Sequence, residues 1–162
     1  MEEIPDFWRT EVFHPLSVHF PIALLVVAFL FKVVALKYSR EVWERGGTVL
    51  LIAGLVTLWI SVFTGDLADG IVSRKICDPT ILKEHENMAW ATAWFFSAGL
   101  GVDLLRQLKY PIFKNMFFRL IMILLLATGT GTLTYTGHLG ASLVYQQAAG
   151  VYVPSQDCAE FE

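Results

Sequence analysis

The chain has 162 residues, of which 55% are hydrophobic and only 17% charged, and its mean hydropathy is +0.54. A soluble domain of this length would carry roughly a quarter charged residues, so the composition excludes that class and favours an integral membrane protein. The formal net charge is −3, and no separate patch of clustered lysine and arginine indicates nucleic-acid binding.

Four segments are apolar enough and long enough to cross a hydrocarbon core, which takes about 20 helical residues. They cover about 16–36, 46–64, 86–106 and 117–137. We therefore expect an all-α integral membrane four-helix bundle with up-down-up-down topology. It forms one domain over residues 1–153, followed by a short tail at 154–162. No heptad or longer repeat is evident.

The distribution of basic residues predicts the orientation, because lysine and arginine are enriched on the cytoplasmic side of membrane helices. The first and third connections, with the adjoining helix ends, hold eight of the twelve basic residues: Lys32, Lys37, Arg40, Arg45, Arg106, Lys109, Lys114 and Arg119. We expect both termini on the outer side, which is the periplasmic side of a bacterial inner membrane.

The two cysteines fall on that outer side, Cys77 in the middle connection and Cys158 in the C-terminal tail. Disulfides persist in oxidising compartments, so a Cys77–Cys158 bridge is expected, with two unpaired thiols as the alternative.

All four histidines are expected in one layer at the outer ends of the helices. His14 and His19 start the first helix, His85 opens the third, His138 ends the fourth, and Asp66 lies at the end of the second. Ionisable groups near hydrocarbon tend to face the interior of a bundle and to serve a function. The histidines are therefore the candidate cofactor-binding residues, against the alternative that each is a solvated or hydrogen-bonded helix end.

Two segments support an interior site. In HPLSVHFPIALL, Pro21 removes a helical hydrogen bond and predicts a kink just past His19. In ATGTGTLTYTGHLG, Gly131 and Tyr135 share the helix face of His138, and the small residues could form a flat wall for a cofactor. Close packing of helices explains such small residues equally well.

Histidines on facing helices are a usual means of holding haem iron in a bundle. His19 and His85 are the first choice of axial ligands for haem b, because the first and third helices lie diagonally across a four-helix bundle. His138 with either is the second choice, and Asp66 would orient a ligand or accept a proton from quinol. The alternative is a zinc or copper ion held by His19, His85, His138 and Asp66.

HPLSVHFPIALL, TGDLAD, the lone His85 and TGHLGASLVYQQAAGV together resemble the bacterial membrane-protein family catalogued as domain of unknown function 2231. The resemblance covers nearly the whole chain and implies a four-helix membrane protein without an assigned activity. Some relatives resemble fusions to Rieske iron–sulfur or cytochrome c-type domains, which implies an electron-transfer setting. It also supports His14, His19, His85 and His138 as the candidate site.

The functional expectation is a b-type cytochrome-like subunit that exchanges electrons with membrane quinol and with a separate redox or respiratory subunit. A metal-binding membrane protein and a cofactor-free accessory subunit of a larger complex remain alternatives, and association of identical chains stays open.

The expected disulfide gives the first testable prediction. Alkylation of the purified, unreduced protein should leave Cys77 and Cys158 unlabelled, and reduction should make both reactive, as seen by intact mass. Two alkylated thiols without prior reduction would contradict the bridge.

Overall fold

The computed structural model describes all residues except 1–3, 39–40, 109, 154–155 and 157–162. The described residues are helical apart from short connections and contain no strand. The elements in chain order are α1 (Thr10–Ser17), α2 (His19–Lys37), α3 (Glu41–Val72), α4 (Pro79–Gln107), the 3-10 helix η1 (Pro111–Lys114) and α5 (Met116–Gln147). Because α1 and α2 follow one another directly, the chain has four helical segments long and apolar enough to cross a membrane.

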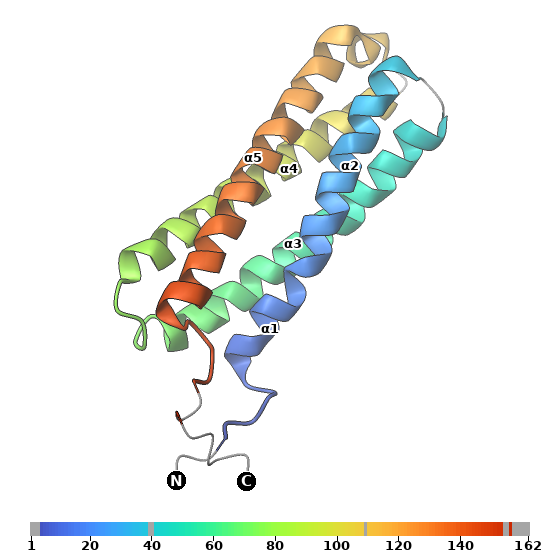
Figure 1. Ribbon diagram of the computed structural model, residues 1–162. Coiled ribbons are helices and arrows are strands. Elements are labelled where there is room, and N and C mark those ends of the chain that lie inside the picture. The colour runs from blue at the N-terminus through green and yellow to red at the C-terminus, as the bar shows by residue number, and fades with distance from the viewer. Residues whose placement is uncertain (1–3, 39–40, 109, 154–155, 157–162) are drawn as a thin grey trace.

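The four segments form two hairpins that lie side by side (Figure 1). Hairpin one is α1 and α2 against α3, and hairpin two is α4 against α5. The hairpins meet where α3 contacts α4 and where α2 contacts α5. The predicted all-α, up-down-up-down membrane bundle is therefore confirmed, with α2 and α4 diagonally opposed.

The helices are longer than the apolar segments predicted from sequence, at one end of the bundle in all four segments and at the other end mainly in α3, which begins five residues early at Glu41. At the end where all four are longer, they begin or end at Thr10, Val72, Pro79 and Gln147, which extends them by six to ten residues beyond the expected limits. At 1.5 Å per residue this adds about 9–15 Å to each helix. We call this end, which carries His14 and His85, the histidine end, and the other the basic end.

The first membrane-crossing segment is interrupted at Val18, between His14 and His19. Pro21 has no N–H to donate to the carbonyl of Ser17, and its ring crowds that carbonyl, so the helix breaks directly after Ser17, at Val18. The break therefore lies just before His19, whereas the sequence pattern predicted a kink just after it. The hydroxyl of Ser17 shares a hydrogen bond with that of Thr64 at 3.0 Å, which fixes the break against α3.

Two helices begin at side-chain caps. Asp78 accepts hydrogen bonds from the amide and the hydroxyl of Thr80 at the start of α4, and these bonds hold the pKa of its carboxyl below the usual value. Asn115 accepts from the amide of Phe118 at the start of α5. Caps of this kind satisfy amides that have no partner within the helix.

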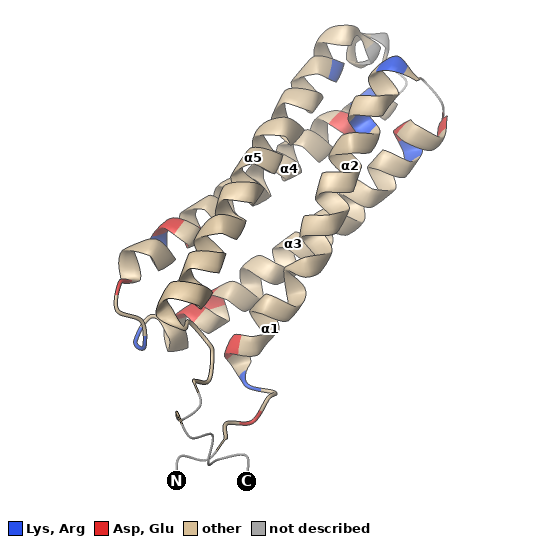
Figure 2. Cartoon of the chain, viewed as in Figure 1, with Lys and Arg blue, Asp and Glu red and all other residues tan. Residues whose placement is uncertain are grey.

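The middle of the bundle is apolar both inside and outside. Leu25, Leu51, Phe96 and Leu126 are fully buried at its core. Large apolar side chains such as Leu124 remain exposed between the helix ends, as lipid contact requires. Figure 2 shows that the charged residues gather at the two ends of the bundle.

Near the basic end, a buried ion pair joins the hairpins. The ammonium group of Lys32 in α2 lies 2.7 and 2.8 Å from the two carboxylate oxygens of Asp103 in α4, and both residues are only 1% exposed. Thr48 in α3 donates to the same carboxylate at 2.6 Å. Lys32 also donates to the hydroxyl of Thr48 and to the carbonyl of Glu44, so its three N–H groups have partners.

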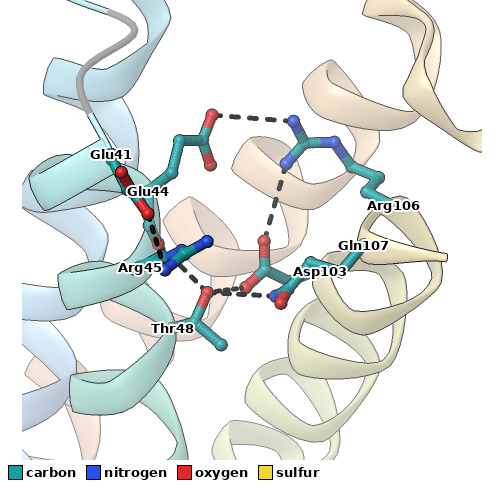
Figure 3. A pocket seen from close by; sticks show the side chains of 7 residues that line it. All are labelled: Glu41, Glu44, Arg45, Thr48, Asp103, Arg106 and Gln107. Carbon is teal, nitrogen blue, oxygen red and sulfur yellow. Dashed lines mark hydrogen bonds and ion pairs between the residues drawn. The ribbon is translucent and has the colours of Figure 1, made fainter. Parts of the chain in front are cut away.

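Further polar contacts around this pair also cross between the hairpins. Glu44 of α3 accepts from Arg119 of α5 at 2.9 Å and lies 3.7 Å from Arg106 of α4. Arg119 also donates to the carbonyl of Ala35. Figure 3 shows the side of this network that lines a pocket of about 460 Å³, formed by Glu41, Glu44, Arg45, Thr48, Asp103, Arg106 and Gln107.

The buried ion pair gives a prediction about stability. Asp103→Leu removes the nearer carboxylate from the buried Lys32 ammonium and leaves that of Glu44, 3.8 Å away. The loss should cost about 3–5 kcal/mol of unfolding free energy. The double variant Lys32→Leu with Asp103→Leu removes both charges and should recover most of that loss. Denaturant unfolding in detergent, followed by far-UV circular dichroism, measures both. Equal losses in the single and double variants would contradict this account of the pair.

Candidate functional site

His14 is held against α3 by one hydrogen bond and one glycine. Its Nδ1 lies 2.9 Å from the backbone carbonyl oxygen of Ser61. The imidazole rests on Gly65, where a Cβ atom would come within 3.2 Å of the ring atoms Cε1 and Nδ1. The absence of a side chain at Gly65 therefore lets the ring lie directly on the helix backbone.

His85 is held against α5 in the same way. Its Nδ1 lies 3.0 Å from the carbonyl oxygen of Thr136, and a Cβ atom at Gly140 would come within 3.2 Å of its Cε1. In both cases the glycine follows the accepting carbonyl by four residues, which is one helical turn. Each imidazole thus lies over one turn of the second helix of its own hairpin.

The two imidazoles face one another across the boundary between the hairpins. Their ring centroids are 6.0 Å apart and their planes are nearly perpendicular, at 87°. His14 comes from α1 and His85 from α4, so the pair lies diagonally across the bundle. Both side chains are half-buried.

The hydrogen bonds also determine which ring nitrogens carry protons. A carbonyl oxygen can only accept, so Nδ1 of each neutral histidine is the donor and Nε2 keeps its lone pair. Within the described part of the chain, neither Nε2 has a hydrogen-bond partner. Each Nε2 lone pair can therefore accept a proton or bind a metal ion.

The other histidines named from the sequence lie elsewhere. His19 and His138 are exposed. Tyr135 is stacked on His138, with ring centroids 6.5 Å apart, and donates to Glu84 at 2.7 Å. At Gly131 an added Cβ would meet nothing within 4 Å, so this glycine does not contact the imidazole pair.

The predicted metal ligands are not gathered in one place. Asp66 is exposed, and no three histidine, cysteine, aspartate or glutamate side chains among the described residues come together as a metal site. Cys77 is exposed in the connection before α4, while Cys158 lies outside the described residues, so the disulfide stays a prediction.

Sequence reasoning found His14 and His85 but missed the residues that hold them. Ser61 and Thr136 act through backbone carbonyls, which no side-chain pattern reveals. Gly65 and Gly140 lie in the motifs TGDLAD and TGHLG, which drew attention for Asp66 and His138 instead. A glycine one turn after the accepting residue, in a helix facing a histidine, was the available signal.

Fold and site together define a class, a four-helix membrane bundle with a pair of opposed histidines near one end. The chain belongs to the family described as predicted membrane protein (DUF2231), whose family model matches residues 11–152. Comparison with curated proteins finds no significant match, and neither does comparison with solved structures.

Proposed function

We propose that this protein is a b-type cytochrome-like electron-transfer protein of the membrane, in which His14 and His85 hold one haem b. The observation that carries the proposal is the pair of opposed imidazoles with centroids 6.0 Å apart. With about 2 Å per metal–nitrogen bond and about 1 Å from nitrogen to ring centre, two imidazoles on opposite sides of one metal ion have centroids roughly 6 Å apart.

The chemical type of the two ligands fits haem iron, as does their spacing. Imidazole nitrogen is a usual axial ligand of haem, and bundle cores are where such sites are built. A ligating histidine almost always donates its other ring N–H to a carboxylate, a carbonyl or water, which fixes the ring and raises its basicity. Ser61 and Thr136 supply that carbonyl to His14 and His85.

In this proposal the haem supplies one-electron chemistry, and the chain binds it, orients it and surrounds it with lipid-facing helices. The ligand pair differs from the first choice made from sequence, because His14 takes the place of His19. The half-buried position of both rings near the histidine end would leave the haem close to water on one side and to lipid on the other.

That position supports a path between two kinds of redox partner. Quinol dissolves in the lipid around the apolar helices, whereas a separate redox or respiratory subunit would approach the histidine end. Quinol oxidation releases two electrons and two protons, so one haem would pass the electrons on singly. Asp66, exposed at the end of the apolar part of α3, is the candidate proton acceptor at this end.

We further propose that the protein lies in a bacterial inner membrane with the histidine end on the periplasmic side. The excess of lysine and arginine at the basic end supports this orientation.

A copper site is the second candidate, and the same geometry favours it. Two neighbouring imidazoles suit a copper ion, since imidazole is a good ligand for copper. The four-ligand set of His19, His85, His138 and Asp66 receives no such support, because two of these histidines and the aspartate are exposed.

The haem proposal predicts a visible spectrum. Protein purified in detergent from a haem-replete host should show a b-type reduced-minus-oxidised spectrum at about one haem per chain by pyridine-haem assay. His14→Ala and His85→Ala should each abolish it, because each removes one axial ligand. His19→Ala and His138→Ala are the matched controls and should keep it.

A flat spectrum from well-folded protein would overturn the haem proposal. Elemental analysis of the same sample then separates stoichiometric copper or zinc, lost in the His14 and His85 variants, from a cofactor-free accessory subunit. Loss of haem in the His19 variant but not in the His14 variant would overturn the ligand assignment.

A further inference from the structure

The second helices of the two hairpins carry the same sequence pattern. LLIAGLVTLWISVFTG at 50–65 and LLATGTGTLTYTGHLG at 125–140 share two leucines at the start, a central glycine, a Thr-Leu pair and a final glycine. All of these matches are 75 positions apart. The expectation that the chain contains no repeat longer than a heptad is therefore wrong. The repeat is hard to see because the first helices of the two hairpins share little sequence.

The buried positions of the two hairpins follow the same register. In α2 and α4 the buried residues correspond at a spacing of 71: Pro21, Leu25, Ala28 and Lys32 match Thr92, Phe96, Gly99 and Asp103. In α3 and α5 most of them correspond at 75, although Thr48, Val62, Val72 and Leu139 have no buried equivalent. The matches are Gly47, Leu51, Gly54, Leu58, Ser61 and Ala68 with Met122, Leu126, Gly129, Leu133, Thr136 and Leu143. The difference of four equals the length of η1, the 3-10 helix of four residues in the connection of hairpin two.

The contacts within the hairpins correspond as well. A Cβ at Gly54 would strike Leu25, and one at Gly129 would strike Phe96 at the equivalent place. The histidine contacts obey the same two spacings, because His85 follows His14 by 71 positions and Thr136 follows Ser61 by 75. The close approach of the helices and the placement of the imidazoles thus occur at equivalent positions in both hairpins.

The contacts between the hairpins also have the pattern expected of two copies related by a twofold axis. In such an interface, if one element of the first copy contacts another element of the second, the reverse contact occurs too. The first helix of each hairpin contacts the second helix of the other, in α2 with α5 and in α4 with α3. Residues that face their own equivalents must lie on the axis, and His14 faces His85 while Lys32 faces Asp103.

We infer that the chain is two structurally equivalent copies of one helical hairpin, joined in tandem around a pseudo-twofold axis along the bundle. The carbonyl and the glycine opposite each histidine are then the repeated positioning residues of the site. Ser61 and Gly65 position His14, and Thr136 and Gly140 position His85. The inference rests on the proposed function only for the identity of what the two imidazoles hold.

The equivalent residues on the axis differ near the basic end and are identical at the histidine end. Near the basic end, identical residues would place two like charges together, and the sequence avoids this with lysine in one copy and aspartate in the other. At the histidine end the residues remain identical, and the two imidazoles lie with their centroids 6.0 Å apart. A ligand that engages two equivalent groups on opposite sides, such as a metal centre with two axial positions, fits this arrangement.

The experiment uses the full chain, without cofactor, labelled with ¹⁵N-histidine in detergent micelles. Long-range ¹H–¹⁵N spectra report the tautomer of each ring, and His14→Ala and His85→Ala assign the signals. Both rings should show a protonated Nδ1 and an unprotonated Nε2. Gly65→Ala should disturb only the His14 signals and Gly140→Ala only the His85 signals, because the added methyl group displaces that ring from its carbonyl.

Gly70→Ala in α3 and Gly131→Ala in α5 are matched controls, since a Cβ at either position meets nothing within 4 Å. They should leave both rings unchanged, and far-UV circular dichroism should show all four variants folded. If haem binds, Gly65→Ala and Gly140→Ala should weaken it by similar factors, of about 10-fold or more.

Different tautomers in the two histidines, or a response to only one of the two glycine variants, would overturn the equivalence of the hairpins. No response to either variant would overturn the positioning role. Because the tautomers are read without cofactor, predicted tautomers in a protein that binds no haem would contradict the proposed function while the duplication stands.

Discussion

The bundle depends on how two apolar hairpins are held together in a solvent that is itself apolar. Lipid chains are as apolar as leucine, so helices in a membrane associate through close packing and polar contacts rather than through the hydrophobic effect. Within each hairpin, close packing suffices, because Gly54 and Gly129 let α2 and α4 approach their partners. Between the hairpins, the Lys32–Asp103 pair and the surrounding network join all four membrane-crossing segments near the basic end.

This joint fixes the geometry of the opposite end. A rigid contact near one end of two long hairpins limits how far they can separate or rotate at the other, where His14 meets His85. The imidazoles are then aimed locally, each by a backbone carbonyl of its own hairpin. Backbone groups inside a helix are held by their own hydrogen bonds, so they orient a ring more firmly than a mobile side chain would.

The sequence predicted the parts of this structure that follow from composition and periodicity. Four apolar segments of about 20 residues required four crossing helices, and short connections required antiparallel neighbours. It could not show how far the helices continue past the apolar segments, because the residues beyond mix polar and apolar side chains and serve equally well in loops. That uncertainty affected the site directly: whether His14 or His19 faces inward depends on the break at Val18 and on the rotation of α1 against α3.

The prediction from sequence missed part of the site because each residue was weighed alone and not by its position in a repeat. His138 and Asp66 look chemically apt, yet each lies beside the glycine that matters, and both are exposed. Aligning 50–65 with 125–140 would have paired Gly65 with Gly140, whereas His14 and His85 pair only at the separate spacing of 71 that relates the first helices of the hairpins. In a duplicated bundle, chemistry that needs two equal ligands belongs on the axis, and residues without an equivalent, such as His19 and His138, are poor candidates for it. The duplication thus selects His14 and His85 from the four histidines, in agreement with their burial and with the distance between them.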